Sequence, residues 1–366
     1  MRIFDHIKKK GIMLRGNNSG VIIFIVLWIL VILTSLVMSL SRNTHVELAL
    51  TKNTIGKIQA KYFAWAGLMF AMKQIQLDSK DQNSSLKDTL FYCGIPIVDG
   101  RSSAEIFHDH KISDGAFDVF YESRTDGQLK VRYGIQDEER FINLNALGLD
   151  SVNVLSSLLT TLGVDDDTAK TIAFSAIDWK DDDAVLSDEK YGAEDDYYQG
   201  LTRSYKTKNY FFESKEELLY VRGMTKEILE KIKPFITVFG RPEQLKINFE
   251  TASEDVLRAL ARAEVIRNPT VDSADADSLI RKMLEYRSGD DRVEFTEDDK
   301  EIERVEDLNP NANEQVIFLA MNQYRIRQSE FLRIHAKGIA GRDKIESHIE
   351  AVVQRVDSSI LYWNRY

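Results

Sequence analysis

The densest group of chemically capable side chains in this sequence lies at 178–198, DWKDDDAVLSDEKYGAEDDYY. Its carboxylates are Asp178, Asp181, Asp182, Asp183, Asp188, Glu189, Glu194, Asp195 and Asp196. Carboxylates packed this closely repel one another unless water solvates them or a cation neutralises them. Calcium accepts about six to eight oxygen ligands and tolerates irregular loops. A calcium site is therefore one interpretation of the segment, and a solvated acidic loop is the other.

The composition of this segment disfavours several kinds of metal site and active site. It contains no histidine or cysteine, which disfavours zinc, and its acids do not follow the EF-hand register. Trp179, Tyr191, Tyr197 and Tyr198 indicate that part of the segment is packed, and a buried carboxylate needs a partner. A pair of glycosidase acids is disfavoured because no substrate-binding pattern accompanies the crowded carboxylates.

Motifs of other enzyme classes are absent from the sequence. It has no Gly-x-Ser-x-Gly, no P-loop and no His-Glu-x-x-His. His108 and His110 are close enough in sequence to share a metal, but no further ligands cluster near them, so solvated loop histidines are the preferred interpretation. We therefore expect a protein that is not an enzyme.

The chain is organised around an apolar run at 21–40, VIIFIVLWILVILTSLVMSL. The run has no charge, proline or glycine and is long enough to cross a bilayer as one helix. Apolar residues continue at helical spacing as far as Gln76. We expect one helix of about 55 residues, or about 80 Å. Its first third lies in lipid and the rest runs along a folded domain.

The charges before the run predict its orientation. Lys8, Lys9, Lys10 and Arg15 precede it, which holds that end in the cytoplasm and exports the chain beyond it. An uncleaved signal anchor and a prepilin leader cut after Gly20 both fit. A secretory signal peptide fits less well, because the run is too long and no small-x-small site follows it directly.

The overall composition sets two further limits. The net charge of the 366 residues is −10, which disfavours a broad nucleic-acid surface. Cys93 is the single cysteine, so the chain cannot form an internal disulfide.

Alternating residues predict one antiparallel sheet built from two distant parts of the chain. The strands are 116–122 and 129–135 in the middle, and 331–336, 347–356 and 359–363 near the end, with a turn at 338–342. The sheet would pack on the long helix, and the chain between its two parts would form an inserted helical lobe. The predicted boundaries are a leader at 1–20, the helix at 21–76, the first sheet segment at 77–141, the inserted lobe at 142–325 and the last strands at 326–366.

The predicted lobe contains a weak internal repeat. Ile142-Asn143-Leu144-Asn145-Ala146 resembles the segment that starts Ile247-Asn248, and a helical pattern follows each copy. The asparagines are interpreted as turn and capping residues. Two hairpins, at 162–165 and 222–225, also share a glycine, an apolar residue and then an N-cap. They resemble helix-hairpin-helix units, but their acidic flanks favour a structural role over DNA binding.

Several motifs together give the chain a family resemblance. They are Gly20 before VIIFIVLWIL, FINLNA at 141–146, IDWKDDD at 177–183, YGAEDDYY at 191–198, ELLYVRGMT at 217–225, PFITVFG at 234–240, KINFETA at 246–252 and ILYW at 360–363. In this order they resemble the minor pseudopilin K family of the type II secretion system, also called general secretion pathway protein K.

This resemblance implies a fold and a function. The fold is α+β and pilin-like: a long N-terminal helix on a small antiparallel sheet, with a large inserted helical domain of helix-hairpin-helix-like (SAM-like) units. The function is to cap the periplasmic pseudopilus with minor pseudopilins I and J during export of folded proteins. The implied location is the bacterial inner membrane, single-pass, with the N-terminus in the cytoplasm and the main domain in the periplasm.

The resemblance also assigns site residues. A prepilin peptidase would cut after Gly20 and methylate Val21. The implied calcium ligands are Asp181, Asp183, Glu194, Asp195 and Asp196. Most pilin-like subunits carry a glutamate where this chain has Ile25, and that glutamate can pair with the free amine of a neighbouring subunit. Its absence suits a terminal subunit.

The apolar stripe of the long helix is the expected partner surface. Its residues, together with Ile25, are Val46, Leu50, Ile58 and Phe63. They would contact partner helices, their own sheet, or each along different lengths. Two other functions remain open: a minor pilin of a type IV pilus, and a membrane-anchored DNA receptor built on the hairpins.

Overall fold

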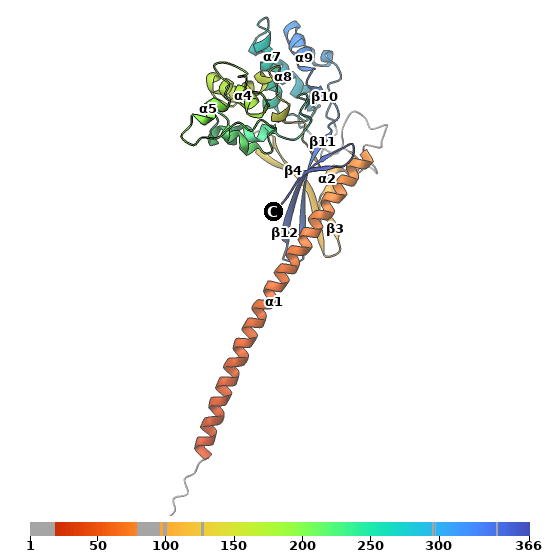
Figure 1. Ribbon diagram of the computed structural model, residues 1–366. Coiled ribbons are helices and arrows are strands. Elements are labelled where there is room, and N and C mark those ends of the chain that lie inside the picture. The colour runs from red at the N-terminus through yellow and green to blue at the C-terminus, as the bar shows by residue number, and fades with distance from the viewer. Residues whose placement is uncertain are drawn as a thin grey trace, which may run out of the picture. The chain divides into compact units, whose positions relative to one another are not determined.

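The computed structural model describes residues 19–78, 96–97, 101–125, 128–294, 296, 298–341 and 343–366 (Figure 1). The chain divides into two compact units between Gly56 and Lys57. Residues 1–18, which make up most of the predicted leader, and Cys93 lie outside the described residues.

The chain begins with one long helix, α1, at Ser19–Asp78. Its 60 residues include no proline and cover the predicted 21–76, so the long helix is confirmed. Within the described part of the chain, this helix is long and apolar enough to cross a membrane. Its apolar side chains from Val21 to Leu40 are exposed, as a lipid-facing surface requires.

The second unit contains a seven-stranded sheet of order β13–β12–β11–β4–β3, with β5 paired to β4 and β6 paired to β11. The strands are β3 (His110–Ile112), β4 (Gly115–Thr125), β5 (Gln128–Tyr133), β6 (Gln136–Asp137), β11 (Phe331–Ala340), β12 (Ile345–Gln354) and β13 (Ile360–Arg365). Every pair is antiparallel. Because β4 lies directly beside β11, the predicted union of mid-chain and C-terminal strands is confirmed. Before the sheet come β1 (Pro96–Ile97), β2 (Arg101–Ser102) and α2 (Ser103–Phe107).

The C-terminal part of α1 packs on one face of this sheet. Ala64, Leu68, Ala71 and Ile75 are buried there. They share a core with Phe117, Val119, Ile334, Ala336, Ile349 and Ala351. Every second residue of β11 faces this core, which is the period of a strand with one covered face.

The turn predicted at 338–342 is wrong for residues 338–340, which belong to strand β11. Gly338 lies inside β11 and pairs with Ser347 on one side and Phe117 on the other. A Cβ at this position would lie 2.1 Å from the Ala60 carbonyl oxygen of α1. The glycine is therefore required for the close approach of helix and strand, not for a turn.

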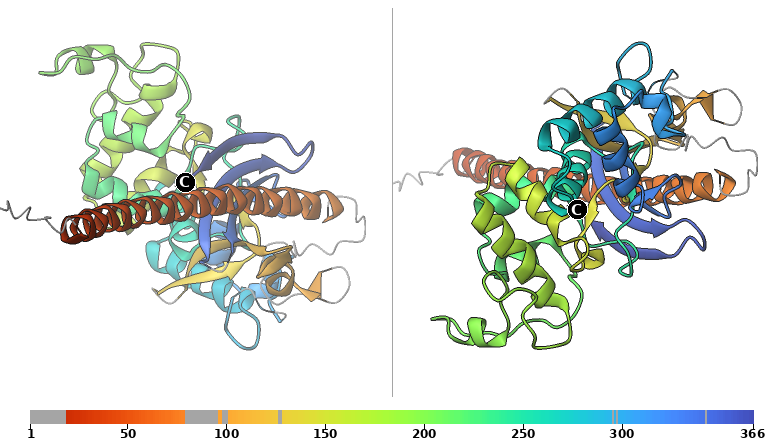
Figure 2. Two further views of the ribbon diagram at one scale, coloured as in Figure 1. Left: turned by 90° about the horizontal axis from the view of Figure 1, so that it is seen from below. Right: turned by 90° about the horizontal axis from the view of Figure 1, so that it is seen from above.

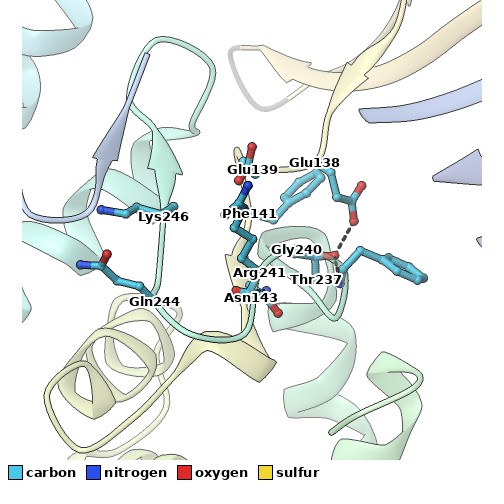
Figure 3. Close-up of a pocket in the computed structure, with 10 residues that line it drawn as sticks. Glu138, Glu139, Phe141, Asn143, Thr237, Gly240, Arg241, Gln244 and Lys246 are labelled. Carbon is cyan, nitrogen blue, oxygen red and sulfur yellow. Dashed lines mark hydrogen bonds between the residues drawn. The ribbon is translucent and has the colours of Figure 1, made fainter. Parts of the chain in front are cut away.

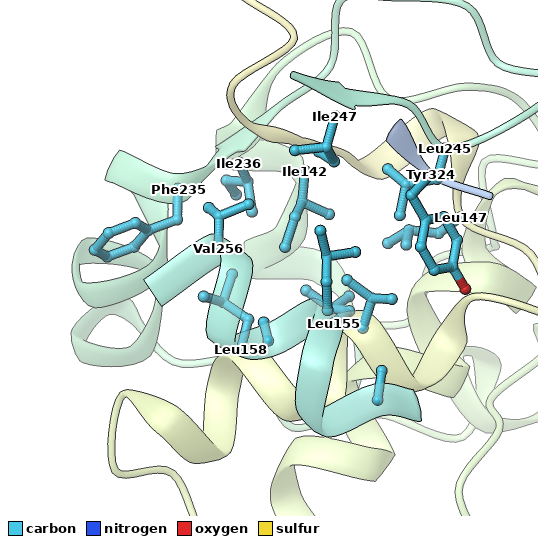
Figure 4. Packing of buried hydrophobic residues seen from close by; sticks show 14 of the residues in the cluster. Ile142, Leu147, Leu155, Leu158, Phe235, Ile236, Leu245, Ile247, Val256 and Tyr324 are labelled. Carbon is cyan, nitrogen blue, oxygen red and sulfur yellow. The ribbon is translucent and has the colours of Figure 1, made fainter. Parts of the chain in front are cut away.

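In the described part of the chain, the segment that runs from β6 to β11 in the sequence contains all the helices that follow α2 (Figures 1 and 2). The α-helices are α3 (Val152–Thr161), α4 (Asp166–Lys180), α5 (Asp195–Gln199), α6 (Lys226–Ile232), α7 (Glu254–Arg267), α8 (Ser273–Arg287) and α9 (Ala312–Met321). The 3-10 helices are η1 (Leu144–Ala146), η2 (Lys215–Tyr220), η3 (Lys233–Phe235) and η4 (Val305–Leu308). We call this region the helical lobe. It has its own apolar core, in which Ile142, Leu155 and Val256 are buried (Figure 4).

The internal repeat corresponds to a repeated structure. The strand β7 (Ile142–Asn143) pairs in parallel with β8 (Ile236–Thr237), and β9 (Ile247–Asn248) pairs in parallel with β10 (Arg325–Ile326). The Asn143 side chain accepts a hydrogen bond from the Asn145 amide, and the Asn248 side chain accepts one from the Glu250 amide. The expected turn or capping role is confirmed for Asn143 and Asn248. It is wrong for Asn145, whose buried amide instead bonds the distant backbone of Phe212 and Val238. A helix follows each turn, and the two helices, α3 and α7, pack together.

The two hairpins share one local geometry. Gly163 and Gly223 both have φ of +83°, a conformation that glycine adopts without strain. The carboxylate of Asp165 then caps α4 at the Thr168 amide, and the hydroxyl of Thr225 caps α6 at the Ile228 amide. The segment that leads into the second hairpin is the 3-10 helix η2.

Candidate functional site

The acidic segment forms a folded loop between α4 and α5, and buried Asp178 in the last turn of α4 organises it. Its Oδ1 accepts a hydrogen bond from the Ser187 amide at 2.9 Å, and its Oδ2 accepts one from the Ala193 amide at 2.6 Å. A Cβ on Gly192 would lie 2.4 Å from that Oδ2, so glycine is required there. Asp178 therefore folds the loop back onto the helix that precedes it.

Three of the predicted ligands meet inside this loop. Asp181, Asp183 and Glu194 each offer an oxygen within 4.8 Å of the others. We call these residues the carboxylate cluster. Asp181 Oδ1 and Glu194 Oε1 are buried and have no hydrogen-bond partner. A buried carboxylate oxygen without a hydrogen-bond donor is stabilised when it binds a proton or a cation.

The pKa values of the carboxylate cluster also indicate that it would be stabilised by a proton or a cation. Burial, and then the charges of Asp178 and Asp183, raise the pKa of Asp181 to about 6. Burial, and then the charges of Asp178 and Asp181, raise the pKa of Glu194 to about 7. Each shift means that the charged form is disfavoured when no counter-charge is present.

The other two predicted ligands lie elsewhere in the structure. Asp195 Oδ1 accepts hydrogen bonds from the Thr207 amide at 2.9 Å and from the Thr207 hydroxyl at 2.8 Å. Asp196 is exposed in the first turn of α5. Neither belongs to the carboxylate cluster, and their assignment as ligands stays a prediction.

Sequence reasoning missed the supporting role of two polar residues on α4. Ser175 donates its hydroxyl to the Tyr191 carbonyl oxygen, and Asp178 receives the two amides described above. Both side chains therefore hold the loop. Their spacing of i and i+3 on an otherwise apolar helix face was a signal that could have revealed this role.

The aromatic residues of the loop pack, as expected for Trp179 and Tyr198. Both are buried, and their rings meet edge to face at 5.4 Å. The Tyr198 hydroxyl accepts a hydrogen bond from the Arg222 amide, which ties the loop to the second hairpin. Tyr197 is 40% exposed.

A second group of acids lies where the helical lobe joins the sheet (Figure 3). Buried Glu138 accepts hydrogen bonds from Arg333 Nε and Nη2, both at 2.7 Å, and from the Thr237 hydroxyl. Glu139 Oε2 accepts the Glu330 amide at 2.5 Å. The adjoining cavity has a volume of about 10 Å³, room for a single water. These residues therefore join the lobe to the sheet, and the cavity is too small for a substrate.

Comparison with known proteins finds relatives of one family. Residues 140–241, which include the carboxylate cluster and both hairpins, match the family described as type II secretion system (T2SS), protein K. Type II secretion system protein K of Aeromonas hydrophila is 25% identical over 258 residues, covering 64% of this chain and 67% of that protein. Putative type II secretion system protein K of Escherichia coli K12 is 24% identical over 282 residues, covering 74% of this chain and 76% of that protein.

The chain is thus similar to the type II secretion system protein K family, over residues 140–241 by its family model and over most of the chain by these two relatives. A solved structure has the same fold: a chain of the GspK–GspI–GspJ complex from enterotoxigenic E. coli aligns with a TM-score of 0.59. The alignment covers 86% of this chain and 99% of that chain, at 16% sequence identity. The α+β fold, with a long N-terminal helix and an antiparallel sheet, is thus shared with that solved chain.

The residues predicted to be processed and the predicted partner stripe lie along α1. Gly20 and Val21 are at its exposed start. Ile25, Val46, Leu50 and Ile58 are each at least half exposed. Phe63 differs, because its ring lies against Gly115 of the sheet.

The two histidines considered as a metal pair have separate surroundings in the structure. His108 Nδ1 lies 3.0 Å from Asp118 Oδ1. The His110 ring stacks on Phe117 at 4.6 Å and also contacts Phe70. Each ring is therefore held by its own neighbours within the sheet domain.

Proposed function

We propose that this chain is a minor pseudopilin of the type II secretion system, a structural subunit and not an enzyme. The observation that carries the proposal is a membrane-length helix that continues into a sheet domain of the protein K fold. A filament subunit needs both features, because one end anchors in lipid while the other end stacks on similar subunits.

The proposed orientation follows from the basic residues before α1. Lys8, Lys9, Lys10 and Arg15 would stay in the cytoplasm, so the chain from Ser41 would lie in the periplasm. A prepilin peptidase would then cut after Gly20 on the cytoplasmic side and methylate Val21.

The proposed partners are the minor pseudopilins I and J, since the relative of known structure was solved in a complex named for these proteins. The exposed side chains of α1 support this proposal. Val46, Leu50 and Ile58 lie beyond the 21–40 run and stay at least half exposed. Apolar side chains at helical spacing outside lipid are suited to packing against a second helix.

The test is copurification of the full chain with its own I-like and J-like subunits from detergent-solubilised membranes. Wild type should retain both partners, whereas Leu50→Asp and Ile58→Asp should reduce retention at least about tenfold, about 1.4 kcal/mol. Lys52→Asp and Lys57→Asp are matched controls, because they place the same charge at positions that are already polar. Equal retention by all four variants would contradict the proposed surface, and failure of wild type to retain either partner would contradict the function.

We further propose that the carboxylate cluster binds calcium. Asp181, Asp183 and Glu194 supply oxygen donors alone, which suits a hard cation. Two of their oxygens are buried without a hydrogen-bond donor, and a bound ion would satisfy both. The ion would stabilise the loop; it has no proposed catalytic role.

We propose that the hairpins of the helical lobe are structural helix-hairpin-helix-like (SAM-like) units of an inserted domain. The first hairpin leads into α4, which begins with Asp166 and Asp167 after the Asp165 cap. These carboxylates would repel a phosphate backbone. The proposal therefore disfavours the DNA-receptor alternative, which requires salt-sensitive binding to duplex DNA.

A further inference from the structure

The face of the sheet opposite α1 carries a cluster of rings near the end of the chain. On β11, Leu332, Ile334 and Ala336 face the α1 core, so the alternate residue His335 faces the other way. On β12, Ile349 faces the α1 core and its neighbour His348 faces the same way as His335. His335 pairs with Glu350, and Lys337 pairs with His348, so the two histidines are diagonal neighbours on adjacent strands.

A tyrosine completes this cluster from the neighbouring strand. The amide of His348 donates to the Tyr366 carbonyl oxygen at 2.9 Å, and the amide of Tyr366 donates to the His348 carbonyl oxygen at 3.2 Å. Tyr366 thus lies directly opposite His348 beside the end of β13. Its ring stacks on the His348 ring at a centroid distance of 5.5 Å.

The donor atoms of the three side chains converge. His335 Nε2 lies 3.2 Å from His348 Nδ1, and the Tyr366 hydroxyl lies 3.0 Å from the same His335 Nε2. Zinc binds imidazole nitrogen at about 2.0–2.1 Å. At a tetrahedral angle, two such nitrogens are about 3.3 Å apart. The spacing of the two histidine nitrogens is close to this value before any ion is placed.

We propose that His335, His348 and Tyr366 bind a divalent ion of the zinc class on the outer face of the sheet, with solvent completing the coordination. The site differs in chemistry from the carboxylate cluster. Imidazole nitrogens select zinc, copper or nickel, whereas carboxylate oxygens select calcium. The two sites would therefore bind different ions on one molecule.

The surroundings of the histidines suit a cation. The two nearby basic side chains are already paired: Arg333 with Glu138 and Glu350, and Lys337 with Asp118 at 3.2 Å. Glu346 Oε2 lies 3.9 Å from His348 Nε2, the nitrogen that would carry the proton when Nδ1 binds an ion. The centroid of the Phe120 ring lies 4.3 Å from the centroid of the His335 ring. Phe120 belongs to β4, which pairs with β11 on the side away from β12.

The test is a zinc titration of the full chain in detergent, with saturating calcium present to occupy the carboxylate cluster. Isothermal calorimetry should show one zinc site in wild type. His335→Asn and His348→Asn should each weaken zinc binding more than about 100-fold, beyond the loss expected for an outer-shell partner. Asparagine can still form a hydrogen bond, so these variants separate ligation from simple hydrogen bonding. Tyr366→Phe should weaken binding less, by about tenfold.

A cobalt titration of the wild-type chain tests the coordination geometry directly, without any variant. Co²⁺ bound by two imidazoles in a tetrahedral site should give intense visible absorption bands, and zinc should remove them. His108→Asn is the matched control, because His108 lies in the same domain but is bonded to Asp118. Zinc affinity that is equal in wild type and His335→Asn, or a wild-type cobalt spectrum of hexaaqua type, would overturn the proposal.

Discussion

At the scale of single residues, the carboxylate cluster depends on burial. Asp181, Asp183 and Glu194 are not unusual in type, and Asp183 is exposed like its neighbour Asp182, whereas Glu194 is buried and Asp181 is half-buried. What distinguishes the cluster is that two of its oxygens are buried without donors while Asp178 adds a further negative charge nearby. An ion is therefore worth more here than at the exposed acids of the same loop.

The calcium proposal predicts residue-specific losses. In wild type, calcium should raise the melting temperature of the full chain, because an ion that binds the folded state alone stabilises it. Asp181→Asn and Glu194→Gln should each remove most of that rise. Differential scanning fluorimetry in detergent, with calcium or with chelator, measures the effect. Asp290→Asn is the control, since that exposed acid pairs with Lys300. A calcium response that survives both cluster variants would contradict the assignment.

Glu139 gives a prediction about pH. Burial, and then the charge of Asp137, raise its pKa to about 8 from an ordinary value of 4.5. The folded state then binds more protons than the unfolded state between these two values. The free energy of unfolding should therefore fall as pH rises through this window, by up to about 1.4 kcal/mol per pH unit.

The matched variant is Glu139→Gln, whose amide oxygen can still accept the Glu330 amide. The variant should flatten the pH profile of stability, measured by thermal melting in detergent at pH of about 5.5 and about 8. The difference between the two slopes isolates Glu139 from other titrating groups. Parallel profiles for wild type and variant would show that Glu139 is charged throughout.

At the scale of elements, the contact between α1 and β11 sets how the sheet domain is built. Small residues on both sides, Ala60 and Ala64 on the helix and Gly338 on the strand, let the backbones approach. The same face carries the larger residues Leu68 and Ile75 farther along the helix. The helix is thus fixed on the sheet by shape as well as by apolar area.

This contact predicts that Gly338→Ala is strongly destabilising. The new Cβ would lie 2.1 Å from the Ala60 carbonyl oxygen and 2.2 Å from the Ala64 amide nitrogen, so α1 must shift. We expect a loss of about 1–3 kcal/mol, the range for overpacking. Gly200→Ala is the control, because its new Cβ would make an ordinary contact at 3.4 Å. Chemical denaturation of both variants checks the difference, and equal stabilities would contradict the close packing.

At the scale of the whole molecule, the proposed function makes the start of α1 the part of the chain that would enter a filament. The proposed cut after Gly20 would leave Val21 as the first residue of a helix that is exposed along its apolar run. Ile25 lies five residues into that mature chain, where a glutamate would pair with a neighbour's amine. A subunit with isoleucine there lacks this contact, which is consistent with a terminal position.

Processing predicts a clear change in mass. Wild type from membranes of the native host should begin at methylated Val21, whereas Gly20→Phe should keep the leader and stop secretion, because a bulky side chain blocks the peptidase. Mass spectrometry of the N-terminal peptide measures both. Gly16→Phe, at another leader glycine, should be cut normally. A wild-type chain that still begins with Met1 would refute the assigned cut.

The sequence by itself determined the elements of this protein. A run without charge or proline specifies the α1 helix, alternation specifies the strands, and repeated Asn and Gly specify the turns of the lobe, because each pattern acts through neighbours along the chain. These local rules could also place an acidic loop between α4 and α5. They could not separate Asp181 and Glu194 from Asp195, whose side chain is taken by Thr207.

The tertiary structure alone decided which side chains meet. Gly338 looked like a turn residue because sequence spacing carries no information about a helix that packs on the strand from far away. His335, His348 and Tyr366 come together from three segments of the sheet, and Glu138 at the junction binds Arg333, which lies 195 residues farther along the chain. Such contacts depend on register and on burial, and both are set only when the distant segments pack against each other.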